Sequence, residues 1–208
     1  MKTIKELMEW RFACKHFDKN KQIPENELRE ILEAARLAPS SNGLQAWKFV
    51  VVSNPELRQK LLPACYNQAQ ITEASVLVFF CARTDLMGET GVIKRFVELT
   101  KKEQERTDEQ SEKYKAYLEN SAVSKTAEQL LSWVQKQVYI PAETLILAAA
   151  EKGIDSCPME GFITTEVAKV LELPEYLTPT VLVSLGYRNM NQPKKVRFPF
   201  EEVVEFRN

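Results

Sequence analysis

Histidine is almost absent from this chain of 208 residues, because His16 is the only one. A histidine-rich metal centre is therefore excluded, and no metal site is expected. Any Ser-His-Asp or Cys-His catalysis would have to run through His16, which lies in an expected loop and is interpreted as solvent-exposed. Side chains alone thus offer little catalytic chemistry.

Glycine is also scarce, at six residues, and neither a G-x-G-x-x-G nor a G-x-x-x-x-G-K-[ST] motif occurs. These absences exclude Rossmann dehydrogenases and P-loop nucleotide hydrolases. If the chain is an enzyme, its difficult chemical step is most easily supplied by a bound cofactor.

The chain also lacks paired cysteines, strong net charge and long apolar runs. Its four cysteines are widely spaced, which is typical of reduced thiols. A net charge of −1 leaves no broad basic field for nucleic acid. The longest wholly apolar run, residues 76–82, is too short for a membrane span, and the N-terminus lacks the apolar core of a signal peptide. The sequence indicates a cytoplasmic protein without nucleic-acid or membrane partners.

Hydrophobic periodicity predicts a single α+β domain over residues 1–208. The expected helices cover residues 4–10, 24–38, 55–62, 126–152 and 165–171, and the expected strands cover 47–52, 75–81 and 180–186. The strand at 75–81 shows no polar alternation and should be central, buried on both faces. Pro141 removes a backbone donor inside the long helix, so a kink or break is expected there.

Three other segments depart from this pattern. Residues 88–125 are rich in Lys, Glu and Gln, which predicts either a solvated helical pair or a helical excursion that covers a site, with Tyr114 and Tyr117 as candidate lid residues. Residues 154–162 are expected to form a loop, and residues 193–208 an extended C-terminal arm.

The stretch around which the chain is organised is the small, hydroxyl-rich segment 38–47. A loop of this kind, between a helix and an apolar strand, can bring backbone N–H groups up to a flat anionic ligand, so it is interpreted as a cofactor loop. Two pairs of cations are candidate phosphate ligands: Arg11 with Lys15, and Lys195 with Arg197, which lie two apart on an extended segment. Taken alone, each pair is better explained as solvated surface.

Six motifs, taken in order, resemble the FMN-dependent nitroreductase family. They are RFACKxF at 11–17, APSSNGLQAW at 38–47, NQAQI at 67–71, KQVY at 136–139, PMEGF at 158–162 and KVR at 195–197. The resemblance covers nearly the whole chain except the excursion at 88–125. It implies an α+β fold with a central mixed sheet flanked by helices, and an intertwined homodimer that holds two FMN molecules at its interface.

The resemblance also implies roles for individual residues. Arg11, Lys195 and Arg197 would hold the FMN phosphate, and Lys15 would stabilise negative charge on the reduced ring. The other implied cofactor-binding residues are Phe12, Ala13, Pro39, Ser40, Ser41, Gly43, Asn67, Gln70, Pro158, Met159, Glu160 and Gly161. The loop residues from Pro39 to Gly43 would come from the partner subunit. No side chain would act as a catalytic acid or base, and the N5 face of the flavin would lie near Glu160 and Gly161.

The implied reaction is a two-electron, ping-pong exchange. NADH or NADPH would deliver a hydride to FMN, and a small-molecule acceptor such as a nitroaromatic or a quinone would then take it. Three alternatives stay open: an enone or dehalogenating reductase on the same flavin, a non-catalytic dimeric flavin-binding interaction protein, and a thiol redox sensor at Cys14 or Cys157. Gln70 stands where the best-known enterobacterial type has a lysine, which predicts a more negative flavin potential.

Overall fold

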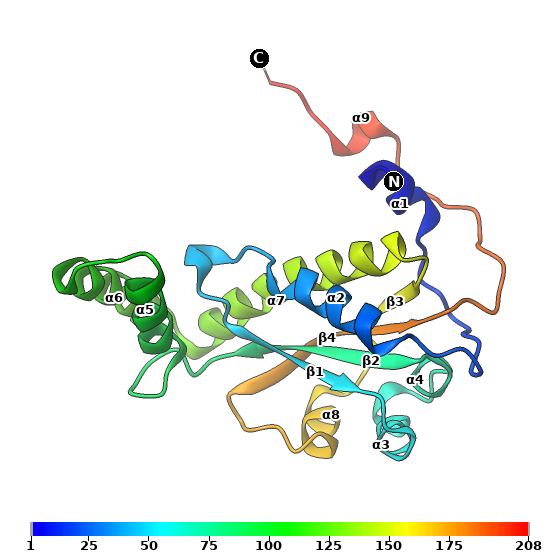
Figure 1. The fold of residues 1–208 in the computed structure, drawn as a ribbon, viewed down its shortest axis with the longest axis horizontal. Helices are drawn as coiled ribbons and strands as arrows, with labels where there is room; N and C mark the ends of the chain where they lie inside the picture. Colours follow the sequence, from blue (N-terminus) through cyan, green and yellow to red (C-terminus); the bar gives the residue numbers. More distant parts are fainter. Residues whose placement is uncertain (1, 208) are drawn as a thin grey trace.

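The computed structural model describes residues 2–207, which form a four-stranded sheet with helices on both faces (Figure 1). The strands are β1 (Trp47–Val52), β2 (Val76–Arg83), β3 (Asp155–Met159) and β4 (Leu177–Gly186). Their order is β1-β2-β4-β3, and each neighbouring pair is antiparallel. The α+β class is confirmed, but the four strands do not form the expected mixed sheet. Helical connections reverse the chain between β1 and β2 and between β3 and β4, so each of these pairs runs antiparallel.

Helices cover the two faces of the sheet unequally (Figure 1). One face carries α2 (Glu25–Arg36) and the long α7 (Ala127–Glu151), and the other carries α3 (Pro55–Leu61), α4 (Gln70–Glu73) and α8 (Thr164–Val170). Each face has its own apolar cluster. Along β2, Val78 and Phe80 join the cluster under α7, whereas Leu77 and Phe79 join the opposite one, as the two-residue period of a strand requires. The prediction of a central strand buried on both faces is confirmed.

Local sequence signals explain where several helices begin. Thr3, Thr107 and Thr126 each form a capping box at the start of α1 (Ile4–Trp10), α6 (Asp108–Val123) and α7. Asn54 caps α3 by accepting a hydrogen bond from the Leu57 N–H at 2.9 Å. These caps satisfy backbone donors that have no partner within the helix.

Of the kink or break expected at Pro141, the break is excluded, because α7 continues through this residue. Pro141 is buried, and its neighbours Leu145 and Ile146 belong to the apolar cluster between α7 and the sheet. Packing along this face outweighs the one hydrogen bond that proline removes.

Residues 155–159 form the strand β3 rather than the expected loop. The polar Asp155 is only 3% exposed, and its carboxylate forms an ion pair with Arg188 at 2.6 Å. Pro158 is tolerated because β3 lies at the edge of the sheet. A buried, ion-paired aspartate and an edge proline therefore give this strand a sequence that is more typical of a turn.

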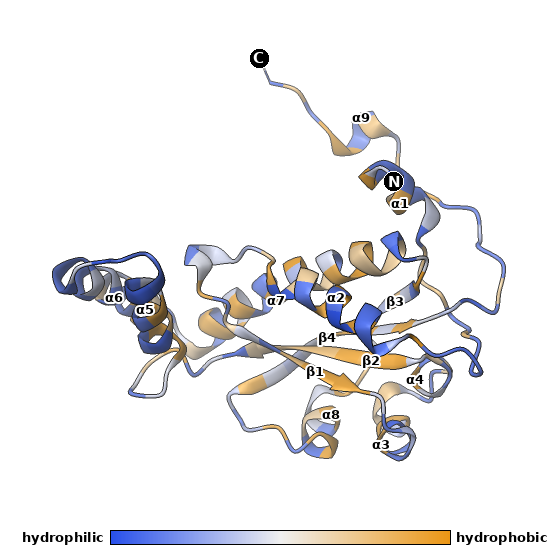
Figure 2. Cartoon of the chain, in the orientation of Figure 1, coloured by the Kyte–Doolittle hydropathy of each residue, from blue (hydrophilic) through white to orange (hydrophobic). Residues whose placement is uncertain are grey.

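Two parts project from this body (Figure 1). The segment between β2 and α7 forms a hairpin of α5 (Val92–Glu103) and α6, hereafter the α5–α6 hairpin. Its surface is largely hydrophilic, with apolar residues on its inner side (Figure 2). The C-terminal segment runs past α1 and includes a short helix, α9 (Phe200–Val203), inside the region expected to be extended. Among the described helices, none is long and apolar enough to cross a membrane.

Candidate active site

Three basic side chains from the two ends of the chain converge beside α1. The Lys195 ammonium donates to the backbone carbonyl oxygen of Arg11 at 2.6 Å and to that of Met8. Burial lowers the pKa of Lys195, and the nearby positive charges of Arg11 and Arg197 lower it further. Within residues 2–207, no carboxylate forms an ion pair with any of the three, and the buried Nε of Arg11 has no hydrogen-bond partner. The cluster is therefore suited to an anion.

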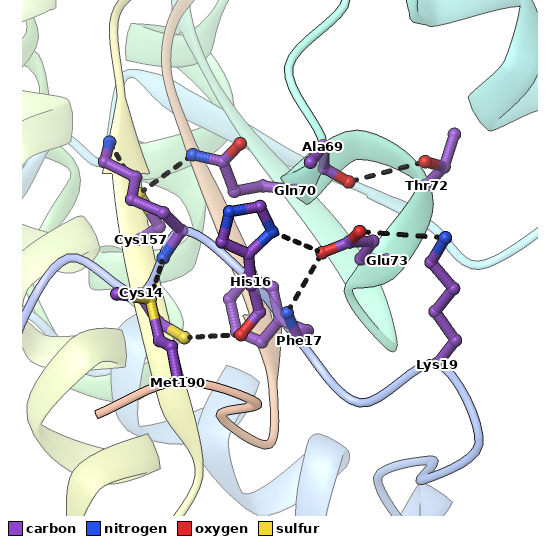
Figure 3. Close-up of polar contacts among 11 residues, drawn as sticks. Cys14, His16, Phe17, Lys19, Ala69, Gln70, Thr72, Glu73, Cys157 and Met190 are labelled. Carbon is purple, nitrogen blue, oxygen red and sulfur yellow. Dashed lines mark hydrogen bonds and ion pairs between the residues drawn. The ribbon is translucent and has the colours of Figure 1, made fainter. Parts of the chain in front are cut away.

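A second group of side chains meets at the sulfur of Cys157 (Figure 3). The Lys15 Nζ lies 3.5 Å from this sulfur and the Gln70 Nε2 lies 3.8 Å from it. The three residues come from three elements: the N-terminal segment, the first position of α4, and β3. The bridge between Ala13 and Ser156 fixes the N-terminal segment beside β3. The fold thus gathers one cation and one amide donor at a single place.

Glu73, at the end of α4, anchors the segment that follows Lys15 (Figure 3). Its carboxylate accepts from the Phe17 N–H at 3.3 Å and lies 3.2 Å from the His16 Nδ1. The His16 side chain is 58% exposed, in agreement with the sequence-based interpretation. Its ring faces a carboxylate rather than a hydroxyl or thiol nucleophile, so the geometry is that of a structural contact.

Residues 158–161, which form the end of β3 and the turn that follows it, are held from two sides. The Gln68 Nε2 donates to the Gly161 carbonyl at 2.7 Å, and a Cβ at Gly161 would lie 3.2 Å from the same nitrogen. The Tyr139 hydroxyl donates to the Glu160 carboxylate at 2.6 Å. Burial is the main cause that raises the pKa of Tyr139 to about 12, and this hydrogen bond is the second cause. Tyr139 therefore stays protonated at neutral pH, and the turn presents a fixed backbone.

The loop at residues 39–45, hereafter the 39–45 loop, lies away from these groups (Figure 1). The Ser41 N–H donates to the Gln137 Oε1 on α7 at 2.8 Å, and the Gln45 N–H donates to the Ser40 hydroxyl at 2.9 Å. In Figure 1 the loop stands near the N-terminal half of α7, whereas α1 and the C-terminal segment stand beyond the opposite end of that helix. A single chain therefore assembles only part of the site that the sequence implies.

The residues predicted from the sequence consequently fall into two groups. The first group comes from the N-terminal segment, the residues at and before α4, the end of β3 with the turn after it, and the C-terminal segment; it comprises Arg11, Phe12, Ala13, Lys15, Asn67, Gln70, Pro158, Met159, Glu160, Gly161, Lys195 and Arg197. The second group comes from the 39–45 loop and comprises Pro39, Ser40, Ser41 and Gly43. Phe12 and Met159 are buried in the core, which leaves mainly their backbone groups available to a ligand.

Sequence analysis missed three polar contacts of the site. Gln137 holds the 39–45 loop, Tyr139 holds Glu160, and Cys157 lies against Lys15. The first two belong to the KQVY motif, so the signal was present but carried no assigned role. The Tyr114 hydroxyl, expected in a lid, donates to the Asn42 carbonyl of the loop, whereas Tyr117 is 57% exposed.

Comparison with known proteins identifies the family. A sequence model of the nitroreductase family matches residues 8–187. A "Putative NAD(P)H nitroreductase" of Staphylococcus haemolyticus is 36% identical over 211 residues, covering 98% of this chain and 97% of its own length. The chain therefore belongs to the nitroreductase family, a family of oxidoreductases, and the resemblance seen in the motifs is confirmed.

Solved structures share the fold. A "putative nitroreductase" of Exiguobacterium sibiricum, determined in complex with FMN, superposes with a TM-score of 0.87 at 22% identity and covers 100% of this chain and 98% of its own. The enone reductase CLA-ER of a gut bacterium superposes with a TM-score of 0.86 at 22% identity, covering 99% and 98%. The α+β architecture described above is thus that of nitroreductase-fold proteins.

Proposed function

We propose that this chain binds FMN and, as a homodimer, transfers hydride equivalents from NADH or NADPH to a small-molecule acceptor in two ping-pong half-reactions. The observation that carries the proposal is the cation cluster of Arg11, Lys195 and Arg197. Its buried Arg11 Nε has no partner within the described residues, and Lys195 has a lowered pKa. A phosphate dianion would satisfy the free donor and offset the repulsion among the three cations.

The remaining groups fit the other parts of an FMN molecule. Lys15 and Gln70 would hydrogen-bond the polar edge of the ring, and residues 158–161, at the end of β3 and in the turn after it, would lie against one ring face. Bound FMN supplies two-electron redox chemistry, which the side chains of the site do not offer. The Lys15 ammonium favours negative charge at the ring edge, so it would favour the reduced state. The fixed backbone of the turn would position reactants without acid or base catalysis.

The homodimer follows from what one chain leaves incomplete. The 39–45 loop lies away from the cation cluster, so a second copy would have to supply this loop to the site (Figure 1). The C-terminal segment exposes Val196, Phe198 and Phe206 by 76–78% each, which a second copy would cover. Sedimentation analysis should give twice the mass of the chain.

Nitroaromatics and quinones are the proposed acceptors. Enone reduction is the second candidate, favoured by the shared fold with an enone reductase. Steady-state rates at several fixed NADH concentrations would distinguish the two, since the preferred acceptor should show the higher kcat/KM. Parallel double-reciprocal lines would support the ping-pong order, and intersecting lines would contradict it.

The phosphate site is tested by comparing FMN with riboflavin, which lacks the phosphate. Three charge-assisted contacts should make FMN bind the apoprotein at least about 100-fold more tightly. Equal affinities would show that the cation cluster does not hold the phosphate, and the proposal would lose its main support.

A further inference from the structure

The α5–α6 hairpin is fastened to the 39–45 loop at two neighbouring residues. The Tyr114 hydroxyl on α6 donates to the backbone carbonyl oxygen of Asn42 at 2.9 Å. The Phe96 ring on α5 packs against Gly43, so that a Cβ atom added at Gly43 would lie 3.2 Å from the Cζ of that ring. Both helices of the hairpin therefore contact the centre of the loop.

The conformation of the loop needs such external support. Asn42, Gly43 and Gln45 have φ angles of 55°, 69° and 51°. Glycine and asparagine adopt this left-handed conformation at low cost, whereas Gln45 keeps it only with support from its surroundings. An open cavity of about 490 Å³ adjoins the loop and is lined in part by Leu44, Gln45 and Phe96, so close-packed side chains do not surround the loop on every side. Within residues 2–207, the Gln45 carbonyl of the loop accepts from the adjoining Trp47 N–H, and its hydrogen bonds to more distant parts of the protein are the one from Tyr114 and the one between Ser41 and Gln137.

Tyr114 is itself held in place by its neighbours. Its ring stacks on Tyr117, with centroids 6.5 Å apart and planes 11° from parallel, and lies against Phe96 at 6.3 Å. The Arg106 guanidinium lies 4.5 Å from the centre of the same ring. The hydroxyl is thus presented to the loop from a fixed position.

We propose that Tyr114 is a positioning residue, which holds the 39–45 loop in the shape that lines the flavin. The α5–α6 hairpin then acts on the site through this loop rather than by covering the ligand with a mobile tyrosine. The inference rests on the proposed function, because the loop has this role only if FMN binds at the dimer interface.

Hydrogen exchange of the FMN-free protein tests the contact itself. In Tyr114→Phe, which keeps the ring but loses the hydroxyl, the loop amides should exchange about 3- to 10-fold faster, as expected for one lost hydrogen bond. Tyr117→Phe is the matched control, because within the described structure its hydroxyl makes no hydrogen bond. Unchanged exchange in Tyr114→Phe would overturn the proposal.

FMN titration tests the consequence for the site. The FMN dissociation constant should rise about 3- to 10-fold in Tyr114→Phe and stay unchanged in Tyr117→Phe, with equal melting temperatures. Faster loop exchange without weaker FMN binding would mean that the contact does not position the loop for the cofactor. Failure of the wild-type protein to bind FMN would overturn the proposed function, whereas the exchange result would still decide whether Tyr114 holds the loop.

Discussion

The ammonium group of Lys195 lies 2.6 Å from the backbone carbonyl oxygen of Arg11, a contact between residues 184 positions apart. It fastens the C-terminal segment to the end of α1 and brings a third cation, Arg197, to the same place. Three like charges repel one another, so an anion that balances them should make the junction more favourable. Ligand binding and the joining of the two chain ends should therefore stabilise each other.

Loss of the Arg11 guanidinium should weaken FMN binding. In Arg11→Ala, one or two charge-assisted hydrogen bonds to the phosphate are lost, so the dissociation constant should rise about 10- to 100-fold. Quenching of flavin fluorescence on binding measures this. Arg29→Ala is the matched control, since Arg29 is exposed on α2 and pairs with Glu25. A similar loss in both variants would show a general charge effect instead of a phosphate contact.

FMN affinity should also fall as the pH rises into the alkaline range. The pKa of Lys195 is lowered from its ordinary value of 10.5, so free protein loses this positive charge at lower pH than an ordinary lysine would. FMN would bind the protein with Lys195 protonated, so binding at alkaline pH should be accompanied by uptake of protons. Lys195→Arg, which stays charged, should keep its affinity there. Identical pH profiles for wild type and Lys195→Arg would refute this role of Lys195.

The flavin potential should respond to the charge beside Cys157. Gln70→Lys adds a second ammonium next to Lys15 and should stabilise the reduced flavin about tenfold over the oxidised form, a positive shift of about 30 mV for a two-electron couple. Lys15→Met should shift the potential in the opposite direction. Lys19→Met, near Glu73 instead of Cys157, serves as the control. An anaerobic redox titration with no shift in Gln70→Lys would contradict the electrostatic role assigned to this position.

The ion pair of Asp155 and Arg188 should be important for stability. Arg188→Ala leaves the Asp155 carboxylate, 3% exposed, without its cation, which should lower the free energy of unfolding by about 3 kcal/mol. Lys5→Ala breaks the exposed pair with Glu9 and should leave stability unchanged within error. Urea unfolding of the FMN-free protein measures both. Equal effects would mean that burial of Asp155 does not matter.

Much of the fold could be predicted from local signals. The strand at Trp47–Val52 and the buried central strand follow from apolar pattern, and α3 follows from Asn54 and Pro55. β3 could not be predicted, because its buried Asp155 is explained only by an arginine 33 residues away. The continuity of α7 through Pro141 likewise depends on packing that a single segment does not reveal.

The candidate site could likewise be predicted from the sequence only in part. Motifs with characteristic residue types, such as Arg11, Lys15 and Lys195, could be singled out, because charge and spacing are visible in the sequence. The contacts of Tyr114 with Asn42 and of Lys15 with Cys157 could not, because they join segments 72 and 142 residues apart. Sequence patterns show which residues can bind a ligand, and tertiary structure determines which residues hold them in place.

The most direct test of the central claim is the visible absorption spectrum of the purified protein, recorded before and after anaerobic addition of NADH or NADPH. The account predicts the bands of bound flavin, present on purification or after addition of FMN, and their bleaching by the reductant. A colourless protein that fails to bind added FMN would contradict it and would favour a dimeric interaction protein without flavin.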